Sequence, residues 1–387
     1  MSKPRSAASR FAMQRKEQVL EQLRQDGAVT VKELAELLGV SEMTVRRDVN
    51  ELSRQGLVTR VHGGVTLRSK LDQTVREREP RGGALARYTI GMVVPSLDYY
   101  WPHVVNGAQL AAAQAGTRLL LRGSTYDAAD NRKKIQTLLD RADVHGILVA
   151  PETAGEQGRE LMRWLNTLPL PVVLAERRPI RDIPSFHLES VATDHASGAE
   201  KAVLHLRALG HERVGLLVAE TRPTAPAVRR GWRETLDRLG LDPQQSVNED
   251  AGRCEGPDGE RFMDDVLRRC RATGTTALLI FADGHALRFV QHATDRGVRV
   301  PDDLAVVAYD DEVAHLGLPA LSAVRPPKSW VGKVGVEMLV SRLDEGGSRP
   351  MHHVRLVPEL IVRESSAPIS ETLQVAATVR EATAPSH

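Results

Sequence analysis

The first part of the chain alternates short apolar stripes at helical spacing with single glycines. Three segments carry such a stripe, at residues 15–25, 31–38 and 42–54, and a glycine follows each of them. Gly39 separates the second segment from the third and permits the tight turn of a helix-turn-helix. Two extended runs, 57–61 and 65–67, flank a His-Gly-Gly turn and predict a β-hairpin. Three helices and a hairpin together predict a winged helix-turn-helix.

From residue 88 the pattern changes to apolar strands that alternate with amphipathic helices. The first series has strands at 89–94, 117–122, 146–150 and 171–175 and helices at about 102–115, 128–141 and 155–165. The second has helices at 194–209, 227–239, 258–270 and 286–296 and strands at 213–218, 277–281 and 304–309. Such alternation is typical of right-handed βαβ units around a parallel sheet. Two series in one chain predict two doubly wound lobes with a cleft between them.

These patterns divide the chain into five parts. We expect a disordered arm at 1–12, the winged helix-turn-helix at 13–67, a basic linker at 68–87, the two-lobed domain at 88–365 and a disordered tail at 366–387. The predicted fold class is therefore α/β, with a small helical head before two doubly wound parallel sheets.

Charge and composition indicate which partner the head binds and in which compartment the protein works. Residues 1–87 hold 17 Lys and Arg against 11 Asp and Glu, whereas the rest of the chain holds 35 against 39. A basic head on a mildly acidic body favours nucleic acid as the partner of the head. No apolar run approaches the ~18 residues of a membrane span, and no apolar signal core follows the basic start. We therefore expect a cytoplasmic protein without a membrane partner.

Cysteine and histidine usage gives no reason to expect a metal or a disulfide. The two cysteines, Cys254 and Cys270, have no metal-ligand spacing and are too few for a disulfide framework. The sequence shows no grouping of a nucleophile with a base and no phosphate-cradling loop. We expect no cofactor, no metal and no catalytic residue, and the protein is not expected to be an enzyme.

The third helix of the head carries the candidate DNA chemistry. Ser41 is placed to cap its first turn, and Val45, Val49 and Leu52 recur at the spacing of a buried face. Its other face carries a hydroxyl and two guanidinium groups, from Thr44, Arg46 and Arg47. Because arginine can bridge a guanine edge or hold a phosphate, this helix suits the major groove of DNA.

Four stretches of the head resemble a known family. They read VTVKELA at 29–35, VSEMTVRRD at 40–48, GLVTR at 56–60 and HGG at 62–64. This pattern resembles the N-terminal domain of the DeoR family of bacterial transcription regulators, in which 41–48 would be the recognition helix. The resemblance and the helix position imply DNA contacts from Lys32, Ser41, Glu42, Met43, Thr44, Arg46, Arg47, Arg60 and His62. A winged helix that contacts RNA or protein instead is the alternative.

The body resembles a second family. The stretches that carry this likeness are IGMVVP at 90–95, VATDHASGA at 191–199, LRALGHERV at 206–214, Gly231-Trp232, VRVPDDLAVVAYDD at 298–311 and LSAVRP at 321–326. They resemble the effector domain of the LacI family, which shares the fold of periplasmic sugar-binding proteins. The likeness implies a small ligand between two lobes, most simply a sugar or sugar-like metabolite, and a homodimer or higher homo-oligomer. The pairing with a DeoR-like head makes the chain a hybrid, and residues 68–87 show no hinge helix.

Ligand residues are expected where strands end, because parallel sheets bind ligands at their carboxyl ends. Three consecutive aromatics at 99–101 stand out in a chain with only 4 Trp, 5 Tyr and 5 Phe, and aromatic faces pack on sugar rings. Charged residues follow the strands that end near 175, 281 and 309. The family places a ligand-binding arginine at the position of Val228, and here the arginines stand at 229 and 230. The candidates are Ser96, Tyr99, Tyr100, Trp101, Glu176, Arg177, Arg230, Asp283 and Asp310. The alternative for the aromatics is lobe packing or a subunit contact. For Glu176-Arg177 it is a surface ion pair, and for Asp310 it is a helix cap.

The sequence therefore predicts a DNA-binding transcription regulator, as a repressor, that binds double-stranded operator DNA under the control of a small effector. The alternative is a sugar-sensing or sugar-carrying protein whose helical head contacts other proteins.

Overall fold

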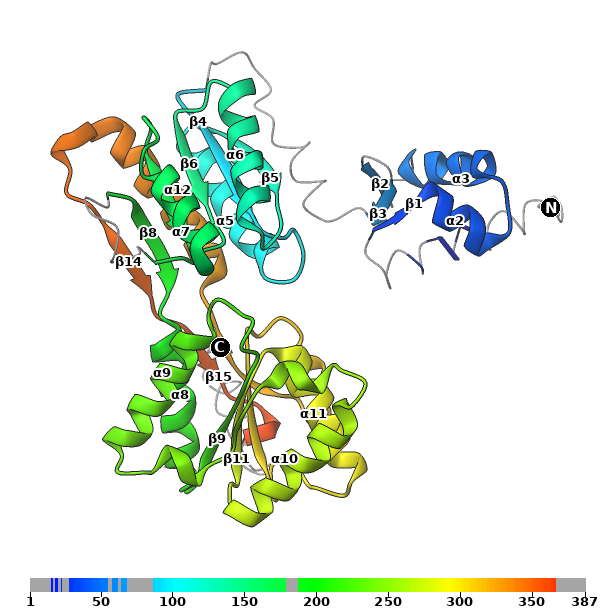
Figure 1. The fold of residues 1–387 in the computed structure, drawn as a ribbon, viewed down its shortest axis with the longest axis vertical. Coiled ribbons are helices and arrows are strands. Elements are labelled where there is room, and N and C mark those ends of the chain that lie inside the picture. Colours follow the sequence, from blue (N-terminus) through cyan, green and yellow to red (C-terminus); the bar gives the residue numbers. More distant parts are fainter. Residues whose placement is uncertain are drawn as a thin grey trace, which may run out of the picture. The chain divides into compact units, whose positions relative to one another are not determined.

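The structure is a computed structural model of the chain, and it describes residues 15, 16, 18, 19, 22, 28–54, 58–61, 64–67, 86–178 and 187–366. The chain divides into two compact units, Met1–Ala84 and Leu85–His387. Figure 1 shows both along the sequence, and each unit is considered by itself below. The predicted arm lies outside the described residues, as do the predicted linker and tail except for residues 86, 87 and 366.

The first unit holds a helix-turn-helix and a small antiparallel sheet. Its helices are α2 (Val31–Leu38) and α3 (Glu42–Arg54), and residues 15, 16, 18, 19 and 22 lie in an earlier helix. Its strands are β1 (Ala28–Thr30), β2 (Val58–Val61) and β3 (Gly64–Leu67), in the order β1-β3-β2. In the register of the hairpin, Val61 of β2 lies opposite Gly64 of β3. The predicted pair of helices and the wing are confirmed, with β3 beginning one residue earlier than expected.

The apolar stripes of the sequence form the core of this unit. The buried set is Val19, Leu34, Ala35, Val45, Val49, Leu52 and Val58. Gly39 adopts a φ of +62° at the turn between α2 and α3, where a side chain would be strained. The turn therefore sets the angle between α2 and α3, and the packing of their buried apolar side chains stabilises that angle.

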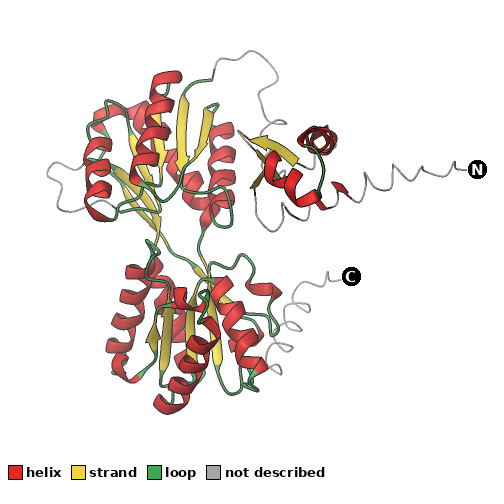
Figure 2. Cartoon of the chain, turned by 45° about the vertical axis from the view of Figure 1, so that its right-hand side comes forward, coloured by secondary structure: helices red, strands yellow, loops and turns green. Residues whose placement is uncertain are grey.

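The first lobe of the second unit is a six-stranded parallel sheet covered by helices on both faces (Figures 1 and 2). Its strands are β4 (Thr89–Val94), β5 (Arg118–Gly123), β6 (Gly146–Val149), β7 (Val172–Ala175), β8 (Glu189–Thr193) and β14 (His353–Leu356), in the order β14-β8-β7-β6-β4-β5. Its helices are α5 (Trp101–Gln114), α6 (Ala128–Arg141), α7 (Gly155–Leu165) and α12 (Lys328–Glu345). The central strands are apolar along their whole length because both faces are buried.

The second lobe repeats the plan. Its strands are β9 (Val214–Val218), β10 (Asn248–Glu249), β11 (Ala277–Phe281), β12 (Ala305–Tyr309), β13 (Ser322–Arg325) and β15 (Glu359–Ile361), in the order β10-β9-β11-β12-β13-β15. Only the edge pair β13–β15 is antiparallel among these described strands. Its helices are α8 (His195–Ala208), α9 (Ala225–Arg238), α10 (Gly259–Thr273) and α11 (Asp283–Asp295). Separate apolar clusters fill the two faces of its sheet, and the predicted α/β class with two parallel-dominated sheets is confirmed.

Within residues 187–366 the chain passes between the lobes three times. The passages join β8 to α8, β13 to α12, and β14 to β15. The alternation in the sequence predicts one lobe after the other and does not predict this return of α12 and β14 to the first lobe. As a result, residues from three distant parts of the chain meet where the lobes face each other.

Helix α12 packs against α5 at very close range. A Cβ atom added to Gly332 would lie 1.8 Å from the carbonyl oxygen of Val104, and one added to Gly107 would lie 1.8 Å from that of Ser329. Glycine is therefore required at both positions for the two backbones to touch. None of the helices in the described part of the chain is long and apolar enough to cross a membrane.

Candidate functional site

Helix α3 presents the candidate DNA-contacting face. The Ser41 hydroxyl accepts a hydrogen bond from the Thr44 amide at 3.3 Å, which caps the first turn. Val45 and Val49 are fully buried, whereas Ser41, Met43 and Arg47 are exposed, Met43 to 77%. The first turns of α3 thus show a polar surface with one large apolar side chain toward solvent. The side chains of Lys32, Glu42, Arg46 and Arg60, and the whole of His62, lie outside what the structure describes.

A partly buried ion pair links α3 to the helix that precedes β1. The Arg15 guanidinium contacts the Asp48 carboxylate at 2.5 Å, and Asp48 is almost fully buried. Because Arg15 belongs to the helix that precedes β1, the pair ties the first helix of the unit to α3. Asp48 therefore orients the helix, and the exposed Arg47 beside it is left to reach a partner.

In the second unit, Glu176 is the centre of a buried polar network at the end of β7. Its Oε1 accepts hydrogen bonds from the Tyr100 hydroxyl and the Thr193 hydroxyl, both at 2.7 Å. Its Oε2 accepts from the Thr193 amide at 3.1 Å and lies 3.4 Å from Nε2 of His195. Glu176 adopts a φ of +54°, a backbone strain that aims its side chain inward. Two predicted residues, Tyr100 and Glu176, are therefore brought into direct contact.

The network sets the protonation of Glu176. Burial alone would raise the pKa of this carboxyl, but the hydrogen bond and charge of His195, with the hydroxyls of Tyr100 and Thr193, outweigh it and lower the pKa to about 2. Burial and the negative charge of Glu176 in turn raise the pKa of Tyr100 well above its usual value. At neutral pH the site holds a carboxylate that accepts from two neutral hydroxyls.

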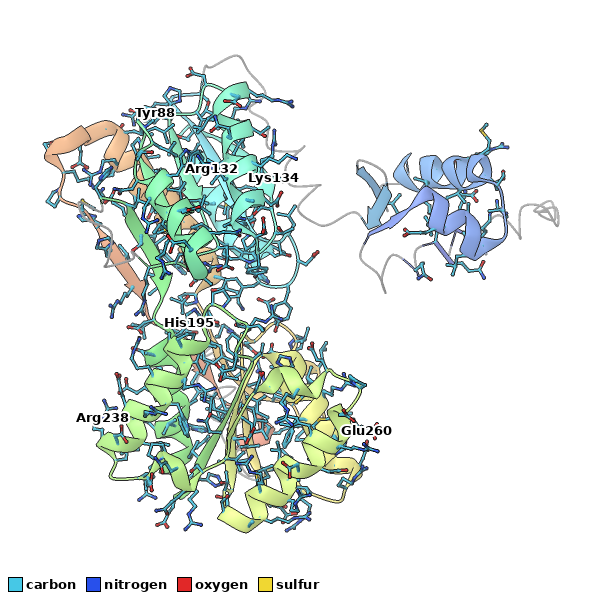
Figure 3. All side chains as sticks on the ribbon, viewed as in Figure 1. Tyr88, Arg132, Lys134, His195, Arg238 and Glu260 are labelled. Carbon is cyan, nitrogen blue, oxygen red and sulfur yellow. The ribbon has the colours of Figure 1, made fainter. Side chains whose placement is uncertain are left out.

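His195 carries this network across the boundary between the lobes, where Figure 3 labels it. It starts α8 directly after the first passage, and its Nδ1 lies 3.1 Å from the hydroxyl of Tyr309 at the end of β12. The sequence interpretation treats His195 as structural and does not include Thr193 or Tyr309. Their only signal is that 191–199 belongs to a family stretch and that Tyr309 ends a predicted strand.

Asp310 and its neighbours form a second polar group on the other lobe. Asp310 is buried with a φ of +96°, and its backbone carbonyl accepts from Nζ of Lys328. Burial raises the pKa of its carboxyl to about 7, opposed by Lys328 and reinforced by Asp283. Lys328 also pairs with Glu312 at 2.6 Å. Asp310 caps no helix: the short 3-10 helix that follows has Val313 at its N-cap, with no side-chain cap bond.

Asp283 is occupied by backbone groups. Its carboxylate accepts from the amides of Asp311, Glu312 and Val313 at 3.2, 2.6 and 3.0 Å, and the residue is fully buried. In this arrangement Asp283 shapes the loop after β12 and offers no free oxygen edge to solvent. Partial burial, followed by the negative charges of Asp310 and Asp283, raises the pKa of Tyr99, so Tyr99 reaches this loop from the first lobe.

The remaining aromatic and hydroxyl candidates hold their own loops. The Ser96 hydroxyl accepts from the Asp98 amide at 3.0 Å. Trp101 is buried, donates from Nε1 to the Tyr126 hydroxyl at 3.3 Å, and meets the Tyr100 ring edge-on with centroids 5.6 Å apart. The predicted aromatic run therefore divides into an exposed Tyr99, a bridging Tyr100 and a packed Trp101.

Two pockets open between the lobes. The smaller, of about 340 Å³, takes in three of the predicted residues, Glu176, Arg177 and Arg230. Its full lining is Thr153, Arg159, Glu176, Arg177, Arg178, Ala192, Thr193, His195, Pro223, Thr224, Pro226, Ala227 and Arg230. The larger, of about 830 Å³, lies beside α5, the start of α12 and the third passage, and contains none of the predicted residues. We call the smaller one the arginine pocket; its size and polar walls suit a small polar molecule.

The described residues contain no group of three or more His, Cys, Asp and Glu placed to hold a metal ion. Both cysteines are buried in the second lobe, and burial raises the pKa of Cys254 to about 11 and of Cys270 to about 12. Neither thiol takes part in the polar groups described above.

Comparison with known proteins identifies both units. Residues 15–70 match the DeoR-like helix-turn-helix domain, and residues 203–366 match the periplasmic binding protein-like domain. The arabinose metabolism transcriptional repressor of Geobacillus stearothermophilus is 25% identical over 361 residues, covering 88% of this chain and 91% of that protein.

Solved structures share the fold. A LacI family transcriptional regulator from Mycobacterium smegmatis is 26% identical, with a TM-score of 0.56 over 72% of this chain and 99% of that one. The transcriptional regulator CelR, in complex with cellobiose, is 24% identical, with a TM-score of 0.59 over 87% of this chain and 99% of that one. The hybrid predicted from the sequence is thereby confirmed: the chain joins a DeoR-like helix-turn-helix domain to a periplasmic binding protein-like domain, and its relatives are transcription regulators.

Proposed function

We propose that the protein is a transcription regulator, acting as a repressor, whose binding to operator DNA is controlled by a small ligand held between the two lobes of its second unit. One observation carries this proposal: a single chain joins a capped helix with an exposed polar face to a polar pocket walled by both lobes. The relatives include named repressors, which favours repression over activation.

A sugar or sugar-like metabolite is the ligand that these walls suit best. The pocket exposes hydroxyl, carboxylate and guanidinium groups, and Tyr99 and Tyr100 supply aromatic surface at the same edge of the first sheet. CelR, which shares the fold, was solved with cellobiose. Of the nine ligand candidates, Tyr100, Glu176, Arg177 and Arg230 are best placed, whereas Asp283 is better explained as a loop organiser. The other candidates remain because they support the walls of the cleft; they are Asp310, Tyr99, Ser96 and Trp101.

Control by the ligand requires that the lobes differ between the bound and free states. His195 and Lys328 stand at two of the three passages and join groups of both lobes. Ligand binding that draws the walls together therefore shifts these passages, which is the kind of hinge closure used by two-lobed binding proteins. We propose a homodimer, whose paired heads would match a palindromic operator. The proposal places the protein in the cytoplasm, as a binding protein and not an enzyme.

A gel-shift experiment on the promoter region of its own gene tests the DNA part. The full chain should give a sequence-preferring shift that weakens steeply between about 50 and 200 mM salt, because phosphate contacts release counterions. A shift that unrelated DNA competes away equally, or no shift at all, would remove the regulator proposal. It would favour a ligand-binding protein whose head contacts other proteins.

A further inference from the structure

Arginines outnumber carboxylates among the residues that line the arginine pocket. Four arginines line it, Arg159, Arg177, Arg178 and Arg230, against one carboxylate, Glu176. The oxygens of Glu176 are already engaged by Tyr100, Thr193 and His195. Arg159 pairs with Glu156 at 3.0 Å on α7. Three guanidinium groups therefore remain to be accounted for.

Arg177 is buried with one nitrogen unused. Only 6% of the residue is exposed, and its Nε and one terminal nitrogen donate to the carbonyls of Pro151 and Glu176 at 2.7 and 2.9 Å. The other terminal nitrogen is buried and has no hydrogen-bond partner among the described residues. Burial lowers the pKa of Arg177. A buried donor without an acceptor costs free energy, so this nitrogen is the natural place for an acceptor atom of a ligand.

Arg178 and Arg230 face the same space from opposite lobes. A terminal nitrogen of Arg178 is buried without a hydrogen-bond partner, and its ion-pair contact, Asp194, is 3.9 Å away and shared with Arg355. Burial and the positive charges of Arg355 and Arg230 lower the pKa of Arg178. Arg230, on α9, contacts Glu234 at 3.8 Å, and both of those side chains are exposed. The positive charges of Arg178 and Arg230 thus face each other across the pocket, and their carboxylate partners are distant.

The start of α9 adds a hydroxyl and the positive end of a helix dipole. Thr224 is its N-cap residue and makes no side-chain cap bond, so the hydroxyl is available to the pocket it lines. The first amides are already used, since Ala225 donates to Arg222 and Ala227 to Thr224, both at 3.0 Å. The helix therefore contributes its dipole to anion binding, without free amides.

The larger pocket differs in this respect. Asp311 pairs there with Arg325 at 2.6 Å and Arg363 at 2.7 Å, and Glu312 pairs with His103 at 2.9 Å and Lys328 at 2.6 Å. Its cations have close carboxylate partners. Arginines with only distant carboxylate partners are therefore a feature of the arginine pocket and not of the larger pocket.

We propose that the effector carries a negatively charged group, a phosphate or a carboxylate, which binds in the arginine pocket between Arg177 and Arg178 of one lobe and Arg230 and Thr224 of the other. The role of this ligand as an effector rests on the function proposed above. An anion there satisfies the unused nitrogens and cancels the repulsion between Arg178 and Arg230. It therefore draws the lobes together, whereas a neutral ligand leaves that repulsion in place.

Thermal unfolding of the full chain tests the proposal. The probes are inorganic phosphate against chloride at equal ionic strength, then a panel of sugar phosphates and sugar acids, each beside its neutral parent sugar. We expect phosphate and at least one anionic sugar to raise the melting temperature, and the neutral parents to have little effect. The phosphate and carboxylate arms of the panel show which group the pocket prefers.

Charge-removing variants locate the effect. Arg178→Gln and Arg230→Gln should each weaken binding of the stabilising anion by about tenfold or more in calorimetry, because each loses a charge-assisted contact. Both side chains are partly exposed, so the fold should tolerate the change. Arg238→Gln is the matched control: it removes the same charge from the same helix about 12 Å further along. Arg238, labelled in Figure 3, pairs there with Glu200. Its affinity for the anion should stay within about twofold of the parent protein.

Two results would overturn the inference: neutral parents that bind as tightly as their anions, or anion binding that Arg178→Gln and Arg230→Gln leave unchanged. A gel-shift experiment on the same preparations distinguishes failure of this inference from failure of the proposed function. DNA binding without any anion effect removes the anionic effector alone, whereas anion binding without sequence-preferring DNA binding removes the regulator proposal.

Discussion

Glu176 shows how one buried carboxylate organises the ligand cleft. It accepts hydrogen bonds from two hydroxyls and an amide, and its partners come from the start of α5, the end of β8 and the first passage between the lobes. Such a group is stable in the interior only while its acceptors are filled. The residue therefore supports the walls of the cleft as well as offering polarity to a ligand.

Removal of the Glu176 charge should lower the free energy of unfolding more at neutral pH than in acid. The pKa of Glu176 falls from 4.5 to about 2 on folding, so the carboxylate contributes stability above pH 4.5 that is lost as the pH falls toward 2. Glu176→Gln should lower the free energy of unfolding by roughly 2–3 kcal/mol at pH 7 and by much less near pH 2.5, measured by urea denaturation.

Glu337→Gln is the control for this pair of measurements, since Glu337 is exposed and lies 3.9 Å from Lys333. It should cost less than about 1 kcal/mol at either pH. An equal loss for Glu176→Gln at both pH values would show that packing, and not the charge, explains the effect.

Arg47 tests whether α3 reads bases. It is exposed on the helix that Ser41 caps. If it bridges a base edge, Arg47→Ala should weaken binding to the preferred DNA by about 1–3 kcal/mol and Arg47→Lys by nearly as much, because lysine lacks the fork. A phosphate contact predicts a smaller loss for lysine. Fluorescence anisotropy with preferred and scrambled duplexes measures both, and unchanged binding of both variants would move the recognition surface elsewhere.

The sequence predicted the site residues whose side chains lie just after a strand of the first sheet. Glu176 and Arg177 come directly after β7, and Tyr100 lies at the end of the loop between β4 and α5, so this edge of the first sheet brings them together. Arg178 follows the same strand as Glu176 and Arg177. Thr193 and His195 reach this place through the first passage between the lobes, and Lys328 through another, which residue spacing alone does not reveal. Asp283 shows the opposite problem: a carboxylate that receives backbone amides has the same position in a sequence as one that receives a ligand.

At the scale of elements, α12 stabilises the first lobe through its close packing on α5. It leaves the second lobe after β13, packs on α5 and returns the chain to β14. The closeness of the two helices depends on Gly107 and Gly332, which leave no room for a methyl group. The cleft residue Lys328 stands at the start of this helix, so its position depends on the same packing.

Gly332→Ala should therefore destabilise the second unit strongly. The added Cβ would overlap the backbone of Val104, which cannot move without displacing α5, and the expected loss is about 2 kcal/mol or more in urea denaturation. Gly284→Ala on α11 is the matched control, because nothing lies within 4 Å of its added Cβ. It should be neutral or stabilise by up to about 1 kcal/mol. Similar effects of the two substitutions would contradict the close packing.

Most elements followed from the hydrophobic pattern, and two causes explain most of the elements that it did not predict. The helices of the head and the βαβ alternation have regular stripes or apolar runs bounded by turns. Helix α12 has its buried face built partly from glycine, including Gly332 and Gly335, so its stripe is faint. Strands β10, β13, β14 and β15 have 2 to 4 residues, which is too short for a period to show.

At the scale of the molecule, one chain joins two units with different features. The first exposes a helix that suits DNA, and the second encloses a pocket whose walls come from two lobes. A ligand that binds one arrangement of the lobes more tightly must, by linkage, change DNA affinity by the same factor as DNA changes ligand affinity. The coupling is typically worth 1–3 kcal/mol, or about 5- to 150-fold.

The most direct test of the central claim is the affinity of the full chain for its preferred promoter fragment, measured by fluorescence anisotropy with and without a saturating amount of the compound that gives the largest thermal stabilisation. We expect the dissociation constant to change by about fivefold or more, and Arg230→Gln to reduce that change while leaving the ligand-free DNA affinity intact. A dissociation constant that stays the same when the cleft is saturated would contradict control of DNA binding by the cleft.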